Sequence, residues 1–305
     1  MVGPAVKRAA VAVARSEYGL SERRACRLVG LVRGSCRYRH RRRDDEPLRA
    51  KLCELAQQRR RFGYRRLGDL MDREGMHANH KRVYRVYAEE KLQVRRRRRK
   101  RMPVGERVRL IPAKTPNQRW SMDFVRDTLA SGRPFRTLTV LDECTRESLA
   151  LEVAASIPGE RVARVLDRIA AERGYPFEIV VDNGPEFTSR ALDQWAHKHG
   201  VRLHFIRPGK PMDNGYIESF NGKYRDEFLS EHWFESIAEA TEQAETWRVD
   251  YNEQRPHQSL GRRTPAEVHA DYERGFAAST GSAVPIANAS GKLALVAELN
   301  LSGAE

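Results

Sequence analysis

The stretch FEIVVDNGPEFTSRALDQWAHKHGVRLHFI, residues 177–206, decides the fold class. It predicts a strand, a turn, a helix and a second strand, at 177–181, 183–185, 189–199 and 201–206. Upstream of it, the apolar patterns predict three strands and one helix, at 120–124, 137–141, 149–153 and 159–173. Three leading strands followed by alternating helices and strands indicate a mixed α/β sheet. Two long helices, over 214–229 and 237–251, are expected to follow.

Three acidic residues fall where this sheet could present them to a substrate. Asp182 directly follows the strand at 177–181, and strand ends are where α/β folds present functional groups. Asp123 lies within the strand expected at 120–124, and Glu218 lies in the helix that follows the sheet. Carboxylates from two strands and a helix can hold hard divalent cations for phosphoryl transfer. With 41 acidic residues in the chain, spacing alone leaves turn-forming aspartates as the alternative.

The charge of the chain is unevenly distributed. The net charge is +15, and residues 1–119 hold 35 of the 56 Lys and Arg but only 12 of the 41 Asp and Glu. Such asymmetry is typical of a polyanion-binding module joined to a part with another task. Binding to a membrane surface is the competing interpretation, but the basic part lacks a strong Trp/Phe face. Nucleic acid is therefore the favoured partner.

Short helices separated by turns are predicted for the basic part. The first unit contains a helix over 6–17 and a second helix capped by Ser21, with Ala25, Leu28 and Val29 on its packed face. The second unit contains helices over 46–60, 64–74 and 80–91, the last capped by Asn79. Helix, turn, helix is the arrangement that places a helix in a DNA groove.

Basic residues beside these helices are candidates for DNA contact. Lys81, Arg82 and Arg85 lie off the apolar stripe of the last helix, although solvated basic faces are also common. The run Arg95, Arg96, Arg97, Arg98, Arg99, Lys100 and Arg101 repels itself and is expected to be a linker that contacts phosphates. The expected domains are 1–44 and 45–94 (both helical, the second DNA-binding), 95–118 (linker), 119–275 (catalytic core) and 276–305 (flexible tail).

Other classes of protein are disfavoured. No stretch approaches the roughly 18 apolar residues of a membrane-spanning helix, and residues 1–14 lack the pattern of a secretory signal, so a cytoplasmic location is expected. The four cysteines show no zinc-ligand spacing and are expected to be free buried thiols.

Three sequence motifs resemble, in order and spacing, those of the integrase core of DDE transposases. They are Trp120–Phe124, Asp182–Phe187 and Asn214–Lys223. The resemblance is closest to the second-frame transposase of the insertion-sequence-three family, and it covers about residues 7–272. The segments Arg61–Leu67 and Asn79–Tyr84 resemble that family's helix-turn-helix, and the segments Tyr251–His257 and Thr264–Glu267 resemble its carboxyl end.

This resemblance implies a fold and an activity. The fold is a ribonuclease H-like integrase catalytic core preceded by an all-α helix-turn-helix DNA-binding region. Asp123, Asp182 and Glu218 would bind two Mg²⁺ ions, with Mn²⁺ as a substitute, and would serve strand cleavage by water and joining by a 3′-hydroxyl. Because the histidines and cysteines show no zinc-ligand spacing, the chain is expected to differ from retroviral integrases, whose leading domain holds zinc.

The resemblance also implies DNA contacts and partners. Arg225, seven positions after Glu218, would meet a DNA phosphate, and Arg65 and Arg66 join the DNA-contact candidates. The expected partners are double-stranded DNA (element ends and target), further copies of the chain and the product of an upstream reading frame. The expected location is the bacterial cytoplasm, at the nucleoid when DNA is bound.

Two rival functions remain at this point. A sequence-specific DNA-binding regulator would keep the basic helices but would need no acidic trio. A metal-dependent nuclease would cleave DNA without joining it. A strand-transfer assay distinguishes the three functions.

Overall fold

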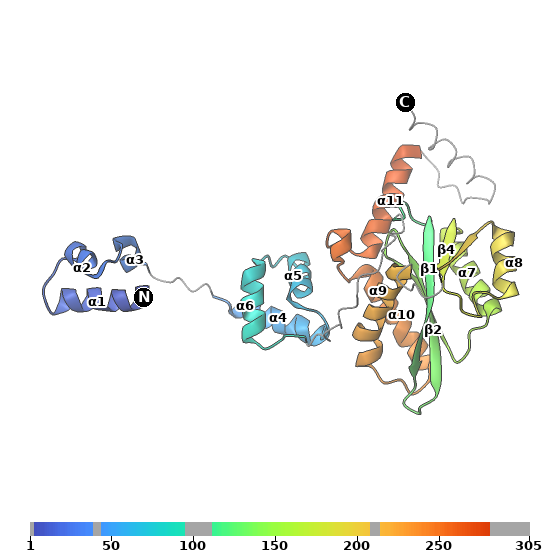
Figure 1. Ribbon diagram of the computed structural model, residues 1–305, viewed down its shortest axis with the longest axis horizontal. Coiled ribbons are helices and arrows are strands. Elements are labelled where there is room, and N and C mark those ends of the chain that lie inside the picture. Colours follow the sequence, from blue (N-terminus) through green and yellow to red (C-terminus); the bar gives the residue numbers. More distant parts are fainter. Residues whose placement is uncertain (1–2, 39–43, 95–111, 208–213, 281–305) are drawn as a thin grey trace. The chain divides into compact units, whose positions relative to one another are not determined.

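The structure is a computed structural model that describes residues 3–38, 44–94, 112–207 and 214–280 (Figure 1). The chain divides into two compact units, Met1–Ala50 and Lys51–Glu305. In the described part of the chain, no helix is both long and apolar enough to cross a bilayer. The domain boundaries expected from the sequence stay predictions.

The first unit is built on three short helices, α1 (Pro4–Ser16), α2 (Glu22–Val29) and α3 (Arg33–Arg37). Ser21 caps α2 by accepting a hydrogen bond from the Arg24 N–H, as expected. The packed face of α2 differs from the predicted one, because Cys26 is packed in place of Leu28. Leu28 is 74% exposed, whereas Ala25 and Cys26 are buried against α1. The expectation of four buried thiols was therefore wrong in part: all four cysteines are free, but Cys26 alone among them is fully buried.

A helical hairpin comprises α5 (Tyr64–Arg73) and α6 (His80–Glu89), preceded by α4 (Glu46–Gln58). Asn79 caps α6 by accepting from the Lys81 N–H at 2.9 Å. The predicted apolar stripe of α6 is confirmed, because Val83, Val86 and Tyr87 are buried. The ring of Tyr64 packs edge-on against Tyr84 across the hairpin.

The second unit contains a five-stranded sheet in the order β3-β2-β1-β4-β5. The strands are β1 (Arg119–Thr128), β2 (Pro134–Asp142), β3 (Ser148–Ala154), β4 (Glu178–Val181) and β5 (Arg202–Phe205). The first three strands pair antiparallel, whereas β4 and β5 join parallel to β1. Parallel pairing requires crossover helices, here α7 (Gly159–Arg173) and α8 (Arg190–His199). The expected mixed sheet is confirmed.

Helices cover both faces of this sheet (Figure 1). Trp120 and Met122 point into one core, which α7 and α8 close with residues such as Leu166 and Leu192. Val125 points into the other core, beneath α9 (Gly215–Glu227) and α10 (Ile237–Glu253). Because side chains alternate along a strand, Asp123 faces the α9 side together with Val125. The chain continues through η2 (Leu229–Glu231), η3 (Gln258–Leu260) and α11 (Pro265–Thr280).

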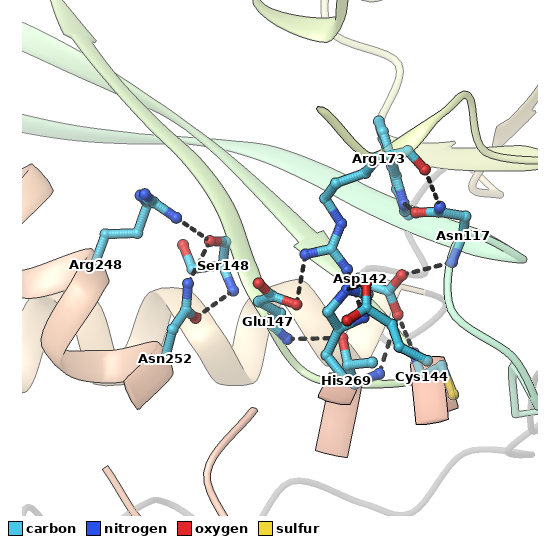
Figure 2. Close-up of polar contacts among 12 residues, drawn as sticks. Asn117, Asp142, Cys144, Glu147, Ser148, Arg173, Arg248, Asn252 and His269 are labelled. Atoms are coloured by element: carbon cyan, nitrogen blue, oxygen red, sulfur yellow. Dashed lines mark hydrogen bonds and ion pairs between the residues drawn. The ribbon is translucent and has the colours of Figure 1, made fainter. Parts of the chain in front are cut away.

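A polar network joins the β2–β3 turn to the later helices (Figure 2). The Asp142 carboxylate accepts hydrogen bonds from the backbone N–H groups of Asn117, Cys144 and Thr145, at 2.8–3.0 Å. Asn252 of α10 exchanges two 2.9 Å bonds with the backbone of Ser148. Asp142 therefore has a structural role at the end of β2.

Candidate active site

Asp123 is a half-buried carboxylate in the middle of β1. Its Oδ1 accepts a 2.7 Å hydrogen bond from the Phe124 N–H, and its Oδ2 accepts a 2.7 Å bond from Asn221 Nδ2 on α9. Burial raises the pKa of Asp123, and the charge of Asp182 raises it further, whereas the bonds from Phe124 and Asn221 lower it. Asp123 is thus a carboxylate whose charge is incompletely compensated by its protein surroundings.

Asp182 lies beside Asp123 because of the register between β4 and β1. The parallel pairing matches Ser121 with Val180, and both acids come two residues after these partners. Asp182 Oδ1 accepts a 2.9 Å bond from the Gly184 N–H, which shapes the turn after β4. A Cβ atom at Gly184 would lie 2.9 Å from the same oxygen, so a side chain at this position would displace the Asp182 carboxylate. The two sequence-predicted aspartates therefore lie at matching positions on neighbouring strands.

Helix α9 is held to β1 by two asparagines that flank Glu218. Asn214 Nδ2 donates to the Met122 carbonyl at 3.3 Å, and Asn221 donates to Asp123. Glu218 is exposed, three residues before Asn221, and residues three apart lie on one helical face with Cβ atoms roughly 5–6 Å apart. Glu218 thus lies within one helical turn of the residue that contacts Asp123. The positioning role of Asn214 was missed at the sequence level.

The oxygens of Asp123 and Asn221 are of the kind that a divalent cation prefers. Asn221 is buried, and its Oδ1 has no hydrogen-bond partner among the described residues, which leaves an oxygen acceptor directly beside Asp123. Carboxylate and amide oxygens are the ligands that hard cations prefer. Across the described ranges, however, no three acidic, His or Cys side chains are close enough to hold one ion together.

Arg225 is exposed on α9 and lies near the same carboxylates. Its charge lowers the pKa of Asp123, opposing the effect of burial. Glu218, Asn221 and Arg225, at i, i+3 and i+7, follow one face of the helix. A positive charge thus flanks the acids on the exposed side of α9.

The other DNA-contact candidates fall into different environments. Lys81 and Arg85 are exposed on α6 and Arg82 is half-buried, with Arg85 2.8 Å from Glu89. Arg65 is exposed on α5. Arg66 instead donates to Glu227 of α9 at 2.7 Å, and burial lowers its pKa. The candidates Arg95, Arg96, Arg97, Arg98, Arg99, Lys100 and Arg101 lie outside the described residues.

Two further polar residues near the motifs are engaged in structure. Glu186 pairs with Arg136 of β2, which lowers the pKa of the Glu186 carboxyl. His257 is buried, and its Nε2 lies 3.3 Å from Arg255 Nη1. His257 therefore has a structural hydrogen-bond partner in Arg255.

Comparisons with known proteins agree with this geometry. Residues 113–211 and 199–265 match integrase core domains, and residues 42–100 match an HTH-like domain. The chain is 53% identical over 259 residues to an uncharacterized 31.7 kDa protein of insertion element IS407 from Burkholderia multivorans, covering 85% of this chain and 94% of that protein. It is 50% identical over 274 residues to an uncharacterized 39.2 kDa protein of insertion element IS476 from Xanthomonas euvesicatoria, covering 89% and 79%. It is 30% identical over 246 residues to transposase InsD of insertion element IS2 from Escherichia coli, covering 75% and 80%.

The integrase core and the strand order together define an enzyme with a ribonuclease H-like catalytic core behind a helix-turn-helix region. The chain belongs to the insertion-sequence-three family of DDE transposases. Its activity is DNA transposition, the cleavage and transfer of DNA strands. Divalent-metal dependence is typical of integrase cores.

Proposed function

We propose that Asp123, Asp182 and Glu218 are the catalytic carboxylates and that together they hold two Mg²⁺ ions, with Mn²⁺ as a substitute. The observation that carries this assignment is the bond from Asn221 to Asp123, which ties the helix of Glu218 to the strand beside Asp182. When bound, such ions activate the attacking oxygen and stabilise the leaving oxygen in phosphoryl transfer.

The protein residues divide the remaining tasks. Asn221 orients Asp123, and the turn at Gly184 orients Asp182, so both carboxylates are fixed before DNA binds. Glu218 and Arg225 project from the exposed face of α9, where Arg225 contacts a phosphate of the reacting strand. Preorganised charges of this kind cost no reorganisation during the reaction.

The basic helices provide the contacts to DNA. Lys81, Arg82 and Arg85 on α6 and Arg65 on α5 contact the element end, and the basic run Arg95–Arg101 neutralises phosphates. The DNA partners are the ends of the element and a target duplex. The active form is a homo-oligomer on DNA, aided by the product of an upstream reading frame. We place the protein in the bacterial cytoplasm, at the nucleoid when it is bound to DNA.

Glu218→Gln tests the catalytic assignment, because it removes the charge and nearly preserves the shape. With labelled element ends and Mg²⁺, cleavage and joining should be lost while affinity for the ends stays within about threefold, since phosphate contacts dominate affinity. Asp123→Asn and Asp182→Asn should behave alike, and the triple variant should be no worse, because the three act as a unit. The matched control is Glu242→Gln, an exposed glutamate of α10, which should retain activity.

Three results would argue against the proposal. Full joining by Glu218→Gln would remove Glu218 from the site. An equal loss of end binding and joining would contradict the division between binding and catalysis. Cleavage without joining in the wild type would favour a nuclease.

A further inference from the structure

We propose that the segment Arg59–Arg66, continued by α5, is a docking element that clamps the helical hairpin to catalytic helix α9 in the same chain. The hairpin and the catalytic carboxylates then move as one body, and this docking sets where the element end is cut. The effect on cutting rests on the proposed binding of element ends by the hairpin, whereas the docking does not.

The centre of the contact is a buried charge cluster on the last turn of α9. Glu227 accepts a 2.7 Å hydrogen bond from Arg66 of the hairpin. It accepts two more, at 2.6 and 2.7 Å, from Arg255, which follows α10 in the sequence. The Glu227 and Arg255 side chains are 7% and 4% exposed. The guanidinium groups of Arg66 and Arg255 both lie over the buried ring of Phe62, 4.8 and 5.7 Å from its centroid.

Half-buried ion pairs surround this centre. Arg59 binds Asp250 of α10 through both guanidinium nitrogens, at 2.5 and 2.6 Å. Arg61 pairs with Asp226 of α9, and its Nε lies 3.8 Å from Glu231. Two-nitrogen contacts from arginine to carboxylate fix orientation as well as distance. The arginines at the start of the hairpin are therefore matched to acids of the core.

A second set of ion pairs extends the contact along α5. Arg73 donates to Glu267 of α11 at 2.6 and 2.9 Å, and Arg262 lies 3.4 Å from the buried carboxyl of Asp69. Glu267 also forms a capping box with Thr264 at the start of α11, which holds its carboxylate in place. The hairpin is thus held at both ends of α5.

This contact accounts for motifs that the catalytic site leaves without a role. The segment Arg61–Leu67 provides the hairpin side of this contact. The segments Tyr251–His257 and Thr264–Glu267 provide Arg255 and Glu267 on the core side. Arg66 meets a core carboxylate, so it positions α9 and does not contact DNA.

Helix α9 transmits the effect to the catalytic centre. Glu227 follows Glu218 by nine residues, which is about 13.5 Å along a rigid helix. Asn221 fixes the catalytic end of the helix to Asp123, and Glu227 fixes the other end to the hairpin. A hairpin bound to an element end therefore has a defined distance to the carboxylates.

Charge reversal and exchange at the Arg59–Asp250 pair test the proposal in the full chain. Both side chains are partly exposed, so Arg59→Asp and Asp250→Arg should fold. Each variant should speed hydrogen exchange in α5 and in the last two turns of α9 without DNA. Each should slow joining by about tenfold to a hundredfold, the cost of slightly misplaced reacting groups. Cut positions at the element end should spread, while end affinity stays within about threefold, because the α6 contacts to DNA are unchanged.

The double variant Arg59→Asp with Asp250→Arg should restore protection, rate and cut position together. The control is Arg164→Asp, at an exposed arginine of α7, which should match the wild type. Unchanged exchange in the single variants would overturn the docking. Altered exchange with unaltered cut positions would overturn its effect on catalysis, and so would a double variant no better than either single one. The catalytic assignment is tested separately by Glu218→Gln.

Discussion

The buried cluster around Glu227 leads to a quantitative prediction about stability. Glu227→Gln keeps the side-chain volume but leaves the almost fully buried Arg255 with an uncompensated charge. Breaking a buried pair in this way costs about 3–5 kcal/mol. The matched control is Glu245→Gln, which removes an equally close two-nitrogen contact, to Arg248, at a glutamate that is 53% exposed. An exposed pair contributes only about 0–1 kcal/mol.

The assay is urea unfolding followed by tryptophan fluorescence. All four tryptophans, Trp120, Trp195, Trp233 and Trp247, belong to the catalytic core, so the signal reports the unit that contains Glu227. With an m value of about 3 kcal/mol/M, Glu227→Gln should lower the midpoint by about 1 M or more, and Glu245→Gln by about 0.3 M or less. Equal shifts in the two variants would refute the reasoning that burial makes the Glu227 cluster essential.

The same cluster predicts a dependence on acid. Burial alone raises the pKa of Glu227, but the bonds and charges of Arg255 and Arg66 outweigh it and hold the pKa below the ordinary 4.5. A depressed folded pKa gives stability that is present above the unfolded value and lost as the pH falls through the folded value. The stability difference between wild type and Glu227→Gln should therefore be constant near neutrality and shrink below pH 4.5.

Three further predictions concern other residues. Burial, with the nearby Arg255 charge, lowers the pKa of His257 to about 2, so the folded chain keeps this ring neutral. The wild type should lose up to about 1.4 kcal/mol of unfolding free energy per pH unit below pH 6.5 relative to His257→Gln, and parallel profiles would contradict this. Arg225→Ala should reduce strand joining far more than binding to element ends. Arg225→Lys should recover part of the loss, because the lysine ammonium is a point charge and replaces a planar guanidinium. Joining by Arg225→Ala at the wild-type rate would remove Arg225 from the site. Neutralising Arg95–Arg101 should flatten the salt dependence of end binding without changing the preferred sequence, and an unchanged slope would show that the run contacts no phosphates.

The sequence alone determined the order and type of most elements, though not helices α3 and α11, and the positions of the candidate acids along them. Alternating apolar residues, caps at Ser21 and Asn79 and the turn after Asp182 are local signals, and local signals survive without knowledge of the fold. The sequence motifs then identified the family, and through it Asp123, Asp182 and Glu218 as candidate metal-binding carboxylates.

The tertiary structure decided which charged residues meet. The β1–β4 register brings Asp182 beside Asp123, and two asparagines seat α9 on β1, because strand pairing and helix packing join residues far apart in the chain. The same limit applies to Arg66, which the family resemblance made a candidate for DNA contact. Its partner Glu227 lies 161 residues away, and no local pattern indicates that an arginine will pair with a distant carboxylate. The burial of Glu227, which makes that pair structural, is a property of the folded chain alone.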